Sequence, residues 1–295
     1  KKMFNTLISL VTGINILSNS DKVVPQNPNP DSYQVNWEDQ LLPASSIPIK
    51  KSNAIEPVIK AKAALSVDLN NGMILYSKNS QDKLPMASLT KLMTAVIILD
   101  ENKLDDVVTV SPLATQIEGS KIWLVKHEKV TVRNLLKDLL INSANDAAVA
   151  LAIYNAGSEE KFVEKMNERT HKLGMNNTHY VNAAGLDADN HYTTVEDLSI
   201  LARYIMSKQT IRDIVVQKSS EISSEDGKTS HKLTTTNELL GSYLKVLGLK
   251  TGTTDAAGQC LISIVENDNG NKIANIVLGS TDRFAESKIL SEWVF

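Results

Sequence analysis

Residues 85–95 read Pro85-Met86-Ala87-Ser88-Leu89-Thr90-Lys91-Leu92-Met93-Thr94-Ala95. From Leu89 onward, apolar residues recur three and four positions apart and continue through Val96 and Ile97. This spacing predicts a buried helix with a wide apolar face. Ser88 stands at the start of the helix, and Lys91 lies three residues later on the same face. The lysine amine can therefore reach the serine hydroxyl.

A serine and a lysine in this arrangement can form a nucleophile and its base. A serine hydroxyl is a weak nucleophile until a neighbouring base accepts its proton. A lysine amine acts as that base only when burial or a nearby positive charge lowers its pKa, and Lys250 is a candidate source of such a charge. The alternative for Ser88 and Lys91 is an ordinary serine cap followed by a solvated lysine.

Two further short motifs accompany this pair, Ser143-Ala144-Asn145 and Lys250-Thr251-Gly252. Each of the three motifs is weak alone, because Ser-x-x-Lys occurs four times, Ser-x-Asn twice and Lys-Thr-Gly once. Only the Ser-x-x-Lys at Ser88 opens a strongly periodic helix. Taken separately, Ser143 would be a loop serine and Lys250 the end of a strand.

The apolar pattern predicts strands at both ends of the globular part and helices between them. Two short apolar runs joined by Asn70-Asn71-Gly72 predict a β-hairpin, and Asn267-Asp268-Asn269-Gly270 predicts another. Thr194 is the expected N-cap of one helix. The predicted strands cover 63–69, 73–77, 246–249, 260–265 and 273–278, and the predicted helices cover 132–140, 146–154, 161–173, 195–207 and 285–293.

Composition limits the class of protein. The chain has 295 residues, of which 42% are hydrophobic and 22% are charged, as in a soluble globular protein. The net charge of −3 gives no reason to expect a nucleic acid partner. The single cysteine, Cys260, excludes an internal disulfide. The five histidines lack metal-ligand spacing, so we expect no metal and no other cofactor.

The first 60 residues differ from the rest. Lys1 and Lys2 precede a mostly apolar stretch, Met3–Leu17, which is shorter than the roughly 20 residues that span a bilayer. A basic start before a short apolar segment favours a secretory signal or a membrane anchor, and the alternative is a buried helix. Residues 18–60 hold six of the eight prolines and are interpreted as a spacer. We therefore expect an extracytoplasmic protein of the cell envelope, secreted or anchored to the cytoplasmic membrane.

The order of the three motifs resembles that of the serine penicillin-recognising enzymes. Flanking sequence narrows the resemblance to the low-molecular-mass D-alanyl-D-alanine carboxypeptidases, and the similar stretches run collinearly over about residues 60–295. Besides residues 85–95, these stretches are 142–148, 173–175, 185–187, 191–194, 197–198, 248–254 and 257–261. One departure is His127, which precedes Glu128 where the family usually has a glycine.

The resemblance implies an α+β fold of the β-lactamase/transpeptidase-like type, in which helices flank an antiparallel sheet and a mostly helical lobe is inserted. The catalytic domain is expected to cover residues 61–295. Its sheet would come from about 61–84 and 245–282, with a C-terminal helix, and its helical lobe from about 94–225. The active site would lie in the cleft between the sheet and the lobe.

The resemblance also implies roles for the motif residues. Ser88 would attack the carbonyl of the penultimate D-alanine in a peptidoglycan stem peptide and form an acyl-enzyme. Lys91 would be the general base, and Asn145 would position it. Ser143 and Lys250 would pass a proton to the leaving D-alanine. β-Lactam antibiotics, which mimic the D-Ala-D-Ala end of the peptide, would acylate Ser88 as covalent inhibitors.

The implied substrate-binding residues belong to the last motif and to one loop: Thr251, Gly252, Thr253 and His191. Lys250 and Thr251 would hold the terminal carboxylate of the stem peptide. The backbone N–H groups of Ser88 and Thr253 would form an oxyanion hole, where donors meet the charge that develops on the tetrahedral intermediate.

The group that activates the hydrolytic water is left open. His191 and Asp187 are weaker candidates, with a loop-structuring role as the alternative. A class A β-lactamase would carry a carboxylate for deacylation within a Glu-x-x-Leu-Asn pattern. No such pattern occurs between Ser143 and Lys250, which disfavours that class.

Two other functions stay open. A D,D-endopeptidase that cuts peptidoglycan cross-links would use the same residues as a carboxypeptidase. A non-catalytic cell-wall binder or antibiotic sensor belongs to a different class, and the presence of all three motifs argues against it.

Overall fold

The computed structural model of the protein describes residues 55–295. The predicted signal or anchor segment, residues 1–17, and the predicted spacer as far as residue 54 lie outside the described residues. Within the part of the chain that is described, no helix is both long and apolar enough to cross a bilayer.

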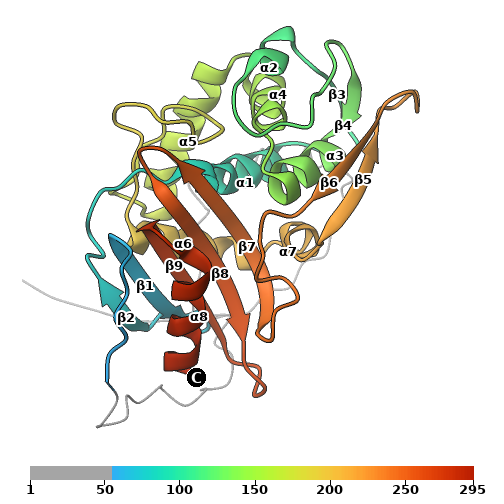
Figure 1. The fold of residues 1–295 in the computed structure, drawn as a ribbon. Helices are drawn as coiled ribbons and strands as arrows, with labels where there is room; N and C mark the ends of the chain where they lie inside the picture. Colours follow the sequence, from blue (N-terminus) through green and yellow to red (C-terminus); the bar gives the residue numbers. More distant parts are fainter. Residues whose placement is uncertain (1–54) are drawn as a thin grey trace, which may run out of the picture. The chain divides into compact units, whose positions relative to one another are not determined.

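Five antiparallel strands form the central sheet in the order β2-β1-β9-β8-β7 (Figure 1). Strand β1 pairs with β9 along its whole length, with Leu65 opposite Ile276. This pairing confirms the prediction that distant segments build one antiparallel sheet. The strands are β1 (Ala63–Asp68), β2 (Ile74–Lys78), β7 (Lys245–Thr254), β8 (Gly258–Glu266) and β9 (Lys272–Ser280).

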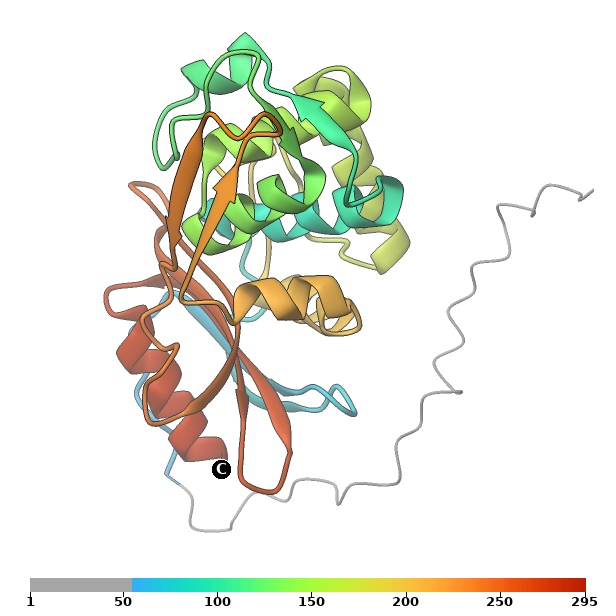
Figure 2. The same cartoon turned by 90° about the vertical axis from the view of Figure 1, so that its right-hand side faces the viewer.

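Helices cover both faces of the sheet, which explains why every residue of β1 is buried. Alternate residues of a strand point to opposite faces. Leu65 belongs to the main core, whereas Ala64 belongs to a second core beneath α8 (Arg283–Val294). Helices α6 (Val195–Met206) and α7 (Gln209–Val215), which fall in the predicted lobe, contact the sheet as well as other helical elements of the lobe. Figure 2 shows α7 and α8 on opposite sides of the sheet.

The helical lobe is built around α1 (Lys91–Glu101), whose first eight residues are all buried. This burial confirms the apolar helix that the sequence predicts after Ser88. The 3₁₀ turn η3 (Ala87–Thr90) comes directly before α1 and packs against β7, so the start of the helix meets the sheet. The other helices of the lobe are α2 (Pro112–Gln116), α3 (Val132–Lys137), α4 (Asn145–Ala156) and α5 (Glu159–Leu173).

Two small two-stranded sheets are additional to the predicted elements. One pairs β3 (Val107–Thr109) with β4 (Lys129–Thr131), and the other pairs β5 (Ser219–Ser223) with β6 (Ser230–Thr234). Strands of three residues are too short to show an alternating pattern. The residues of β5 and β6 are mostly polar and exposed, so an apolar pattern is nearly absent there too.

The β5–β6 hairpin extends from the sheet toward the lobe (Figure 1). There, His231 Nε2 lies 2.9 Å from a carboxylate oxygen of Glu128, and both side chains are buried. The turn before Glu128 is formed by His127 at a φ of 65°, in the left-handed region that glycine adopts most easily. The histidine at this position therefore keeps a turn of the kind that a glycine would form.

Candidate active site

The backbone around Ser88 is crowded. Ser88 follows Ala87, whose φ of 48° is left-handed. A Cβ on Gly185 would fall 2.0 Å from the Ala87 carbonyl oxygen, and a Cβ on Gly252 would fall 2.9 Å from the Ser88 nitrogen. Glycine at both positions therefore lets the loop before Asp187 and strand β7 contact the serine turn. At Gly252, it also leaves space in front of the Ser88 N–H.

Lys91 directs its amine toward three oxygen atoms. Its Nζ lies 2.9 Å from Ser88 Oγ, 2.7 Å from Asn145 Oδ1 and 2.6 Å from the Ala184 carbonyl oxygen. The amide and carbonyl oxygens can only accept hydrogen bonds. A neutral amine has two N–H bonds and donates both to these acceptors, which leaves its lone pair facing Ser88 Oγ. The geometry thus presents Lys91 as a proton acceptor for Ser88.

The orientation of Asn145 is fixed by other contacts. Its Nδ2 donates to the Glu118 carbonyl oxygen at 2.6 Å, and its backbone N–H donates to the Ser120 carbonyl oxygen at 2.7 Å. Because Nδ2 is committed to a carbonyl, Oδ1 is the atom that faces Lys91. The loop before Leu124 therefore helps to aim the lysine amine.

Burial changes the charge state of Lys91. Its side chain has no exposed area, and this desolvation lowers its pKa from 10.5 to about 7. Asp138 and Asp146 act in the opposite direction, because their carboxylates favour the ammonium form. Near neutral pH, a large fraction of the molecules therefore carries Lys91 as a neutral amine.

Lys250 is equally buried but donates only one hydrogen bond among the described residues, to the Thr251 carbonyl oxygen at 3.0 Å. Burial, followed by the nearby Lys91 and Arg283, holds the pKa of Lys250 well below its ordinary value. A bound anion would favour the ammonium form of Lys250. The site therefore places a candidate base and a candidate anion receptor side by side.

Arg283 is a second cation beside the third motif, and sequence reasoning missed it. Its Nη1 donates to the Gly252 carbonyl oxygen at 2.8 Å and to Thr253 Oγ1 at 2.5 Å. Thr251, on the same strand as Gly252, places its Oγ1 2.5 Å from Oγ1 of Thr236, a residue just after β6. Arg283 stands 31 residues after Gly252, so only the folded β8–β9–α8 unit brings it to β7. No local motif marks such a residue.

Ser143 ends the π-helical turn η4 (Asp138–Asn142) with a left-handed φ of 64°. Its backbone N–H donates to the Asp138 carbonyl oxygen. Its hydroxyl has no hydrogen-bond partner among the described residues, and the residue is only 6% exposed. The backbone thus holds Ser143 in place and leaves the hydroxyl uncommitted.

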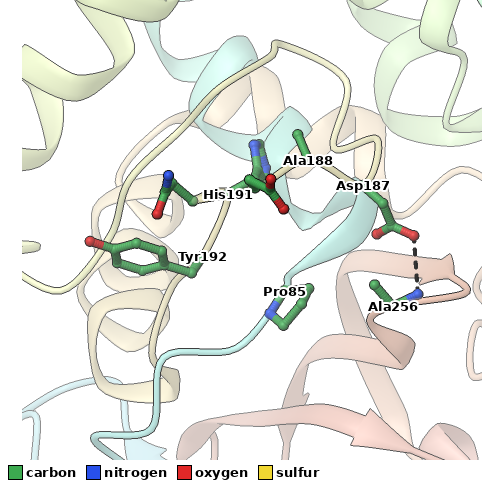
Figure 3. A pocket seen from close by; sticks show the side chains of 8 residues that line it. Pro85, Asp187, Ala188, His191, Tyr192 and Ala256 are labelled. Atoms are coloured by element: carbon green, nitrogen blue, oxygen red, sulfur yellow. Dashed lines mark hydrogen bonds between the residues drawn. The ribbon is translucent and has the colours of Figure 1, made fainter.

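His191 and Asp187 both organise the loop beside the serine turn. His191 Nε2 lies 2.8 Å from Thr90 Oγ1, its Nδ1 accepts a backbone N–H, and burial lowers its pKa to about 4. Asp187 accepts hydrogen bonds from Thr254 Oγ1 at 2.6 Å and from the Ala256 N–H at 3.0 Å. Both residues line an open cavity of about 440 Å³ (Figure 3). Because both nitrogens of His191 are engaged inside the protein, neither is directed at Ser88.

Asn182 is a second residue that sequence reasoning missed. Its Oδ1 accepts the backbone N–H groups of Ala184, Gly185 and Leu186 at 3.2, 2.7 and 3.1 Å. These bonds shape the loop that presents the Ala184 carbonyl oxygen to Lys91. A signal was available, because an asparagine shortly before a glycine is typical of a turn in which the side chain binds the following backbone.

The structure brings the three motifs into one site. Ser88, Lys91 and Asn145 are joined by hydrogen bonds through the lysine amine, while Lys250 is close enough to Lys91 to feel its charge. Across residues 55–295, no three histidine, cysteine, aspartate or glutamate side chains are grouped so as to hold a metal ion. The three motifs supply a serine, a lysine that can serve as its base and a candidate anion receptor, which are the groups that acyl transfer to a serine needs.

Comparisons with known proteins agree with this chemistry. A family model described as D-alanyl-D-alanine carboxypeptidase matches residues 50–282. The chain is 34% identical over 235 residues to D-alanyl-D-alanine carboxypeptidase DacF of Bacillus subtilis. The aligned region covers 78% of this chain and 60% of that protein. It is also 36% identical over 255 residues to D-alanyl-D-alanine carboxypeptidase DacC of Escherichia coli, and this aligned region covers 81% of this chain and 62% of that protein.

A solved structure shares the fold as well. The crystal structure of the Streptomyces K15 DD-transpeptidase superposes with a TM-score of 0.77 at 29% identity, covering 82% of this chain and 99% of that chain. The chain thus spans about three fifths of the two carboxypeptidases and nearly all of the Streptomyces protein.

Proposed function

Since the chain belongs to the D-alanyl-D-alanine carboxypeptidase family of serine peptidases, we propose that it removes the terminal D-alanine from peptidoglycan stem peptides through an acyl-enzyme on Ser88. The observation that carries this proposal is the set of three oxygen atoms around the Lys91 amine. Two of them take the N–H bonds of a neutral amine, and the third is the hydroxyl of Ser88.

Acylation begins when Ser88 Oγ attacks the carbonyl carbon of the penultimate D-alanine. The hydroxyl proton passes to Lys91 Nζ as the new C–O bond forms. The negative charge on the carbonyl oxygen is met by the backbone N–H groups of Ser88 and Thr253. The close approach of Gly252 to the Ser88 nitrogen supports this placement, because a side chain there would intrude on the donor.

The leaving D-alanine needs a proton and carries a carboxylate. Ser143 and Lys250 supply a route for the proton, because the Ser143 hydroxyl is uncommitted and Lys250 lies near Lys91. Lys250 and Thr251 bind the carboxylate, with Arg283 adding positive charge. Loss of D-alanine leaves the peptidyl ester on Ser88, which water then hydrolyses.

β-Lactams are expected to acylate Ser88, and the resulting acyl-enzyme is expected to be hydrolysed slowly. Among residues 55–295, no carboxylate is hydrogen-bonded to Ser88 or Lys91, and Asp187 is committed to Thr254 and Ala256. His191 acts as a positioning residue through Thr90 rather than as a base for water. Slow release distinguishes this protein from a β-lactamase.

The test is product analysis on a synthetic stem pentapeptide. Release of one D-alanine per peptide, abolished by Ser88→Ala, is the expected result. Intact mass should show a penicilloyl adduct on the wild-type protein and none on the variant. A protein that forms neither product nor adduct would be a silent wall binder, contrary to the proposal.

A second candidate function is acyl transfer to an amine instead of water, because the similar Streptomyces structure is named a DD-transpeptidase. Adding a D-amino acid or glycine acceptor to the pentapeptide assay distinguishes the two outcomes by mass. The same assay on a cross-linked dimer tests the D,D-endopeptidase alternative. Both hydrolysis and transfer release D-alanine, so carboxypeptidase activity predicts that the shortened peptide appears as the free acid and not as the acceptor adduct. On the cross-linked dimer it predicts that the cross-link stays intact.

We also propose that the protein works outside the cytoplasm, at the cell envelope. The support is its substrate, which lies there, and the basic apolar start of the sequence, residues 1–17. Anchoring at the cytoplasmic membrane is the finer form of this proposal. Protease treatment of intact spheroplasts should degrade the protein, and protection equal to that of a cytoplasmic marker would contradict it.

A further inference from the structure

Thr90 ends the serine turn η3, and its hydroxyl binds the peptide group that precedes Ser88. The Ala87 carbonyl and the Ser88 N–H belong to this one peptide group, and a planar trans peptide points the two bonds in opposite directions. Thr90 Oγ1 donates a hydrogen bond to the Ala87 carbonyl oxygen at 2.9 Å, and Thr90 has no exposed area. A bond that fixes the carbonyl therefore also fixes the direction of the Ser88 N–H.

This peptide group lies in an unusual conformation. Ala87 has a left-handed φ of 48°, which a residue with a side chain seldom adopts. A Cβ on Gly185 would fall 2.0 Å from the Ala87 carbonyl oxygen, and a Cβ on Gly252 would fall 2.9 Å from the Ser88 nitrogen. The two glycines restrict the space around the peptide group, whereas the hydrogen bond from Thr90 selects the direction of its carbonyl.

His191 determines which way the Thr90 hydroxyl points. Burial lowers the pKa of His191 to about 4, so its ring is neutral near pH 7 and carries one proton. Its Nδ1 accepts the backbone N–H of Val181 at 3.0 Å, which places that proton on Nε2. Nε2 lies 2.8 Å from Thr90 Oγ1 and therefore donates to it. The hydroxyl accepts this bond and keeps its own proton for the Ala87 carbonyl.

The imidazole ring is held by packing as well. Tyr180, which has no exposed area, packs edge-on against His191 with the ring centroids 5.8 Å apart. The hydrogen bonds thus run in one direction, from the backbone of Val181 through the imidazole and the Thr90 hydroxyl to the Ala87 carbonyl. A chain of this kind has one arrangement in which every donor meets an acceptor.

We propose that Thr90 and His191 are positioning residues for acylation: their hydrogen bonds hold the peptide group before Ser88 so that its N–H meets the developing oxyanion. This inference rests on the proposed function. When Ser88 Oγ attacks the substrate carbonyl, its proton passes to Lys91 and negative charge develops on the carbonyl oxygen. A donor that is already aligned with this charge does not have to reorient, so the alignment lowers the barrier.

The test is Thr90→Val, which replaces the hydroxyl with a methyl group of similar size. The protein is acylated with a penicillin that carries ¹³C at the β-lactam carbonyl, and the C=O stretch of the ester adduct is measured by infrared spectroscopy. An aligned N–H donor polarises this bond and lowers its frequency relative to the unfolded adduct. In Thr90→Val the band should move back toward the unfolded value. Acylation should slow by about tenfold, less than the roughly 10²–10³-fold cost of losing a whole oxyanion donor.

Two further variants separate this role from a loss of packing. Thr90→Ser keeps the hydroxyl, so it should retain the wild-type band and acylate within a few-fold of the wild-type rate. The matched control is Thr170→Val in α5, where a buried hydroxyl donates to the carbonyl of Asn167, three residues earlier, at 2.7 Å. It loses the same kind of hydrogen bond and should leave both the band and the rate unchanged.

His191→Phe tests the other end of the chain. It keeps an aromatic ring beside Tyr180 but cannot donate to Thr90, so the ester band should move in the same direction as in Thr90→Val. This variant also replaces Thr90→Val as the test if Thr90→Val does not fold. An unshifted band in folded His191→Phe would overturn the role of His191.

The outcomes separate two claims. A wild-type protein that forms no adduct would refute the proposed function, and this role with it. A wild-type protein that forms the adduct, together with a folded Thr90→Val whose band and rate match it, would overturn the role of Thr90 alone. A band that shifts equally in Thr90→Ser would also contradict that role, because the hydroxyl is still present there.

Discussion

The start of α1 and the middle of β7 each place a lysine in the interior, yet the two lysines have different surroundings. Lys91 meets three oxygen atoms within 2.9 Å, all supplied by the protein. Lys250 meets one carbonyl oxygen and has two other cations nearby. Under the proposed function, two equally buried lysines therefore serve as a base in one place and as a receptor for an anion in the other. The difference lies in the acceptors, not in the residue type.

The largest expected effect comes from removing the base. Lys91→Arg keeps a positive charge but effectively cannot lose its proton. Penicillin acylation of the folded variant should fall by about 10³-fold, within the range that general base catalysis contributes. Lys172→Arg, on the exposed face of α5, is the control and should match the wild type. A Lys91→Arg rate within a few-fold of wild type would remove Lys91 from the base role.

The next effect concerns the contact between the backbone of Gly252 and that of Ser88. A Cβ at Gly252 would approach the Ser88 nitrogen to 2.9 Å, and the atoms that it meets first are main-chain and Ala87 atoms that cannot easily move. Gly252→Ala should reduce acylation by about 10²-fold, as expected when an oxyanion donor is displaced. A Cβ at Gly157 would meet no atom within 4 Å, so Gly157→Ala should leave acylation intact. It should lower only the stability, because the φ of 82° at this position is left-handed. Equal kinetics for the two variants would contradict the crowding argument.

A smaller effect should distinguish Lys250 from Lys91. If Lys250 binds the terminal carboxylate, the wild-type protein should prefer a peptide ending in a carboxylate over the same peptide ending in an amide. Lys250→Met should reduce that preference by about tenfold, since hydrogen bonds to charged groups contribute about 1.5–3 kcal/mol. The measurement is the ratio of kcat/KM for the two peptides. If the ratio is unchanged in Lys250→Met, other groups bind the terminal carboxylate of the peptide, and Arg283 is the first of them to test.

Much of this arrangement could be predicted from the sequence, because its signals are local. The apolar period after Ser88 predicts α1, and Thr194 caps α6 through the Asp197 N–H at 3.1 Å as expected. The hairpin turns at residues 70–72 and 267–270 also lie where Asn and Gly indicate them. Such features depend on neighbours in the chain, so a single sequence displays them.

What could not be predicted depends on contacts between distant segments. Arg283 becomes part of the site only when α8 packs on β8 and β9 and its first residue reaches β7. The Ala184 carbonyl becomes a partner of Lys91 only when the 182–187 loop folds back. The burial of Asp138 is equally invisible, since a charged residue within an amphipathic helix is normally placed on its solvated face. Residue type and spacing carry no information about such contacts between segments that are distant in the sequence.

The central claim is that burial makes Lys91 a neutral amine at working pH. Its most direct test is the rate of Ser88 acylation by a penicillin as a function of pH. Because the pKa of Lys91 is lowered to about 7, the ammonium form should dominate below that pH and block proton transfer. The rate should therefore rise with pH through an acid limb near 7 and level off above it. An acid limb near the ordinary lysine value of about 10.4 would contradict the account.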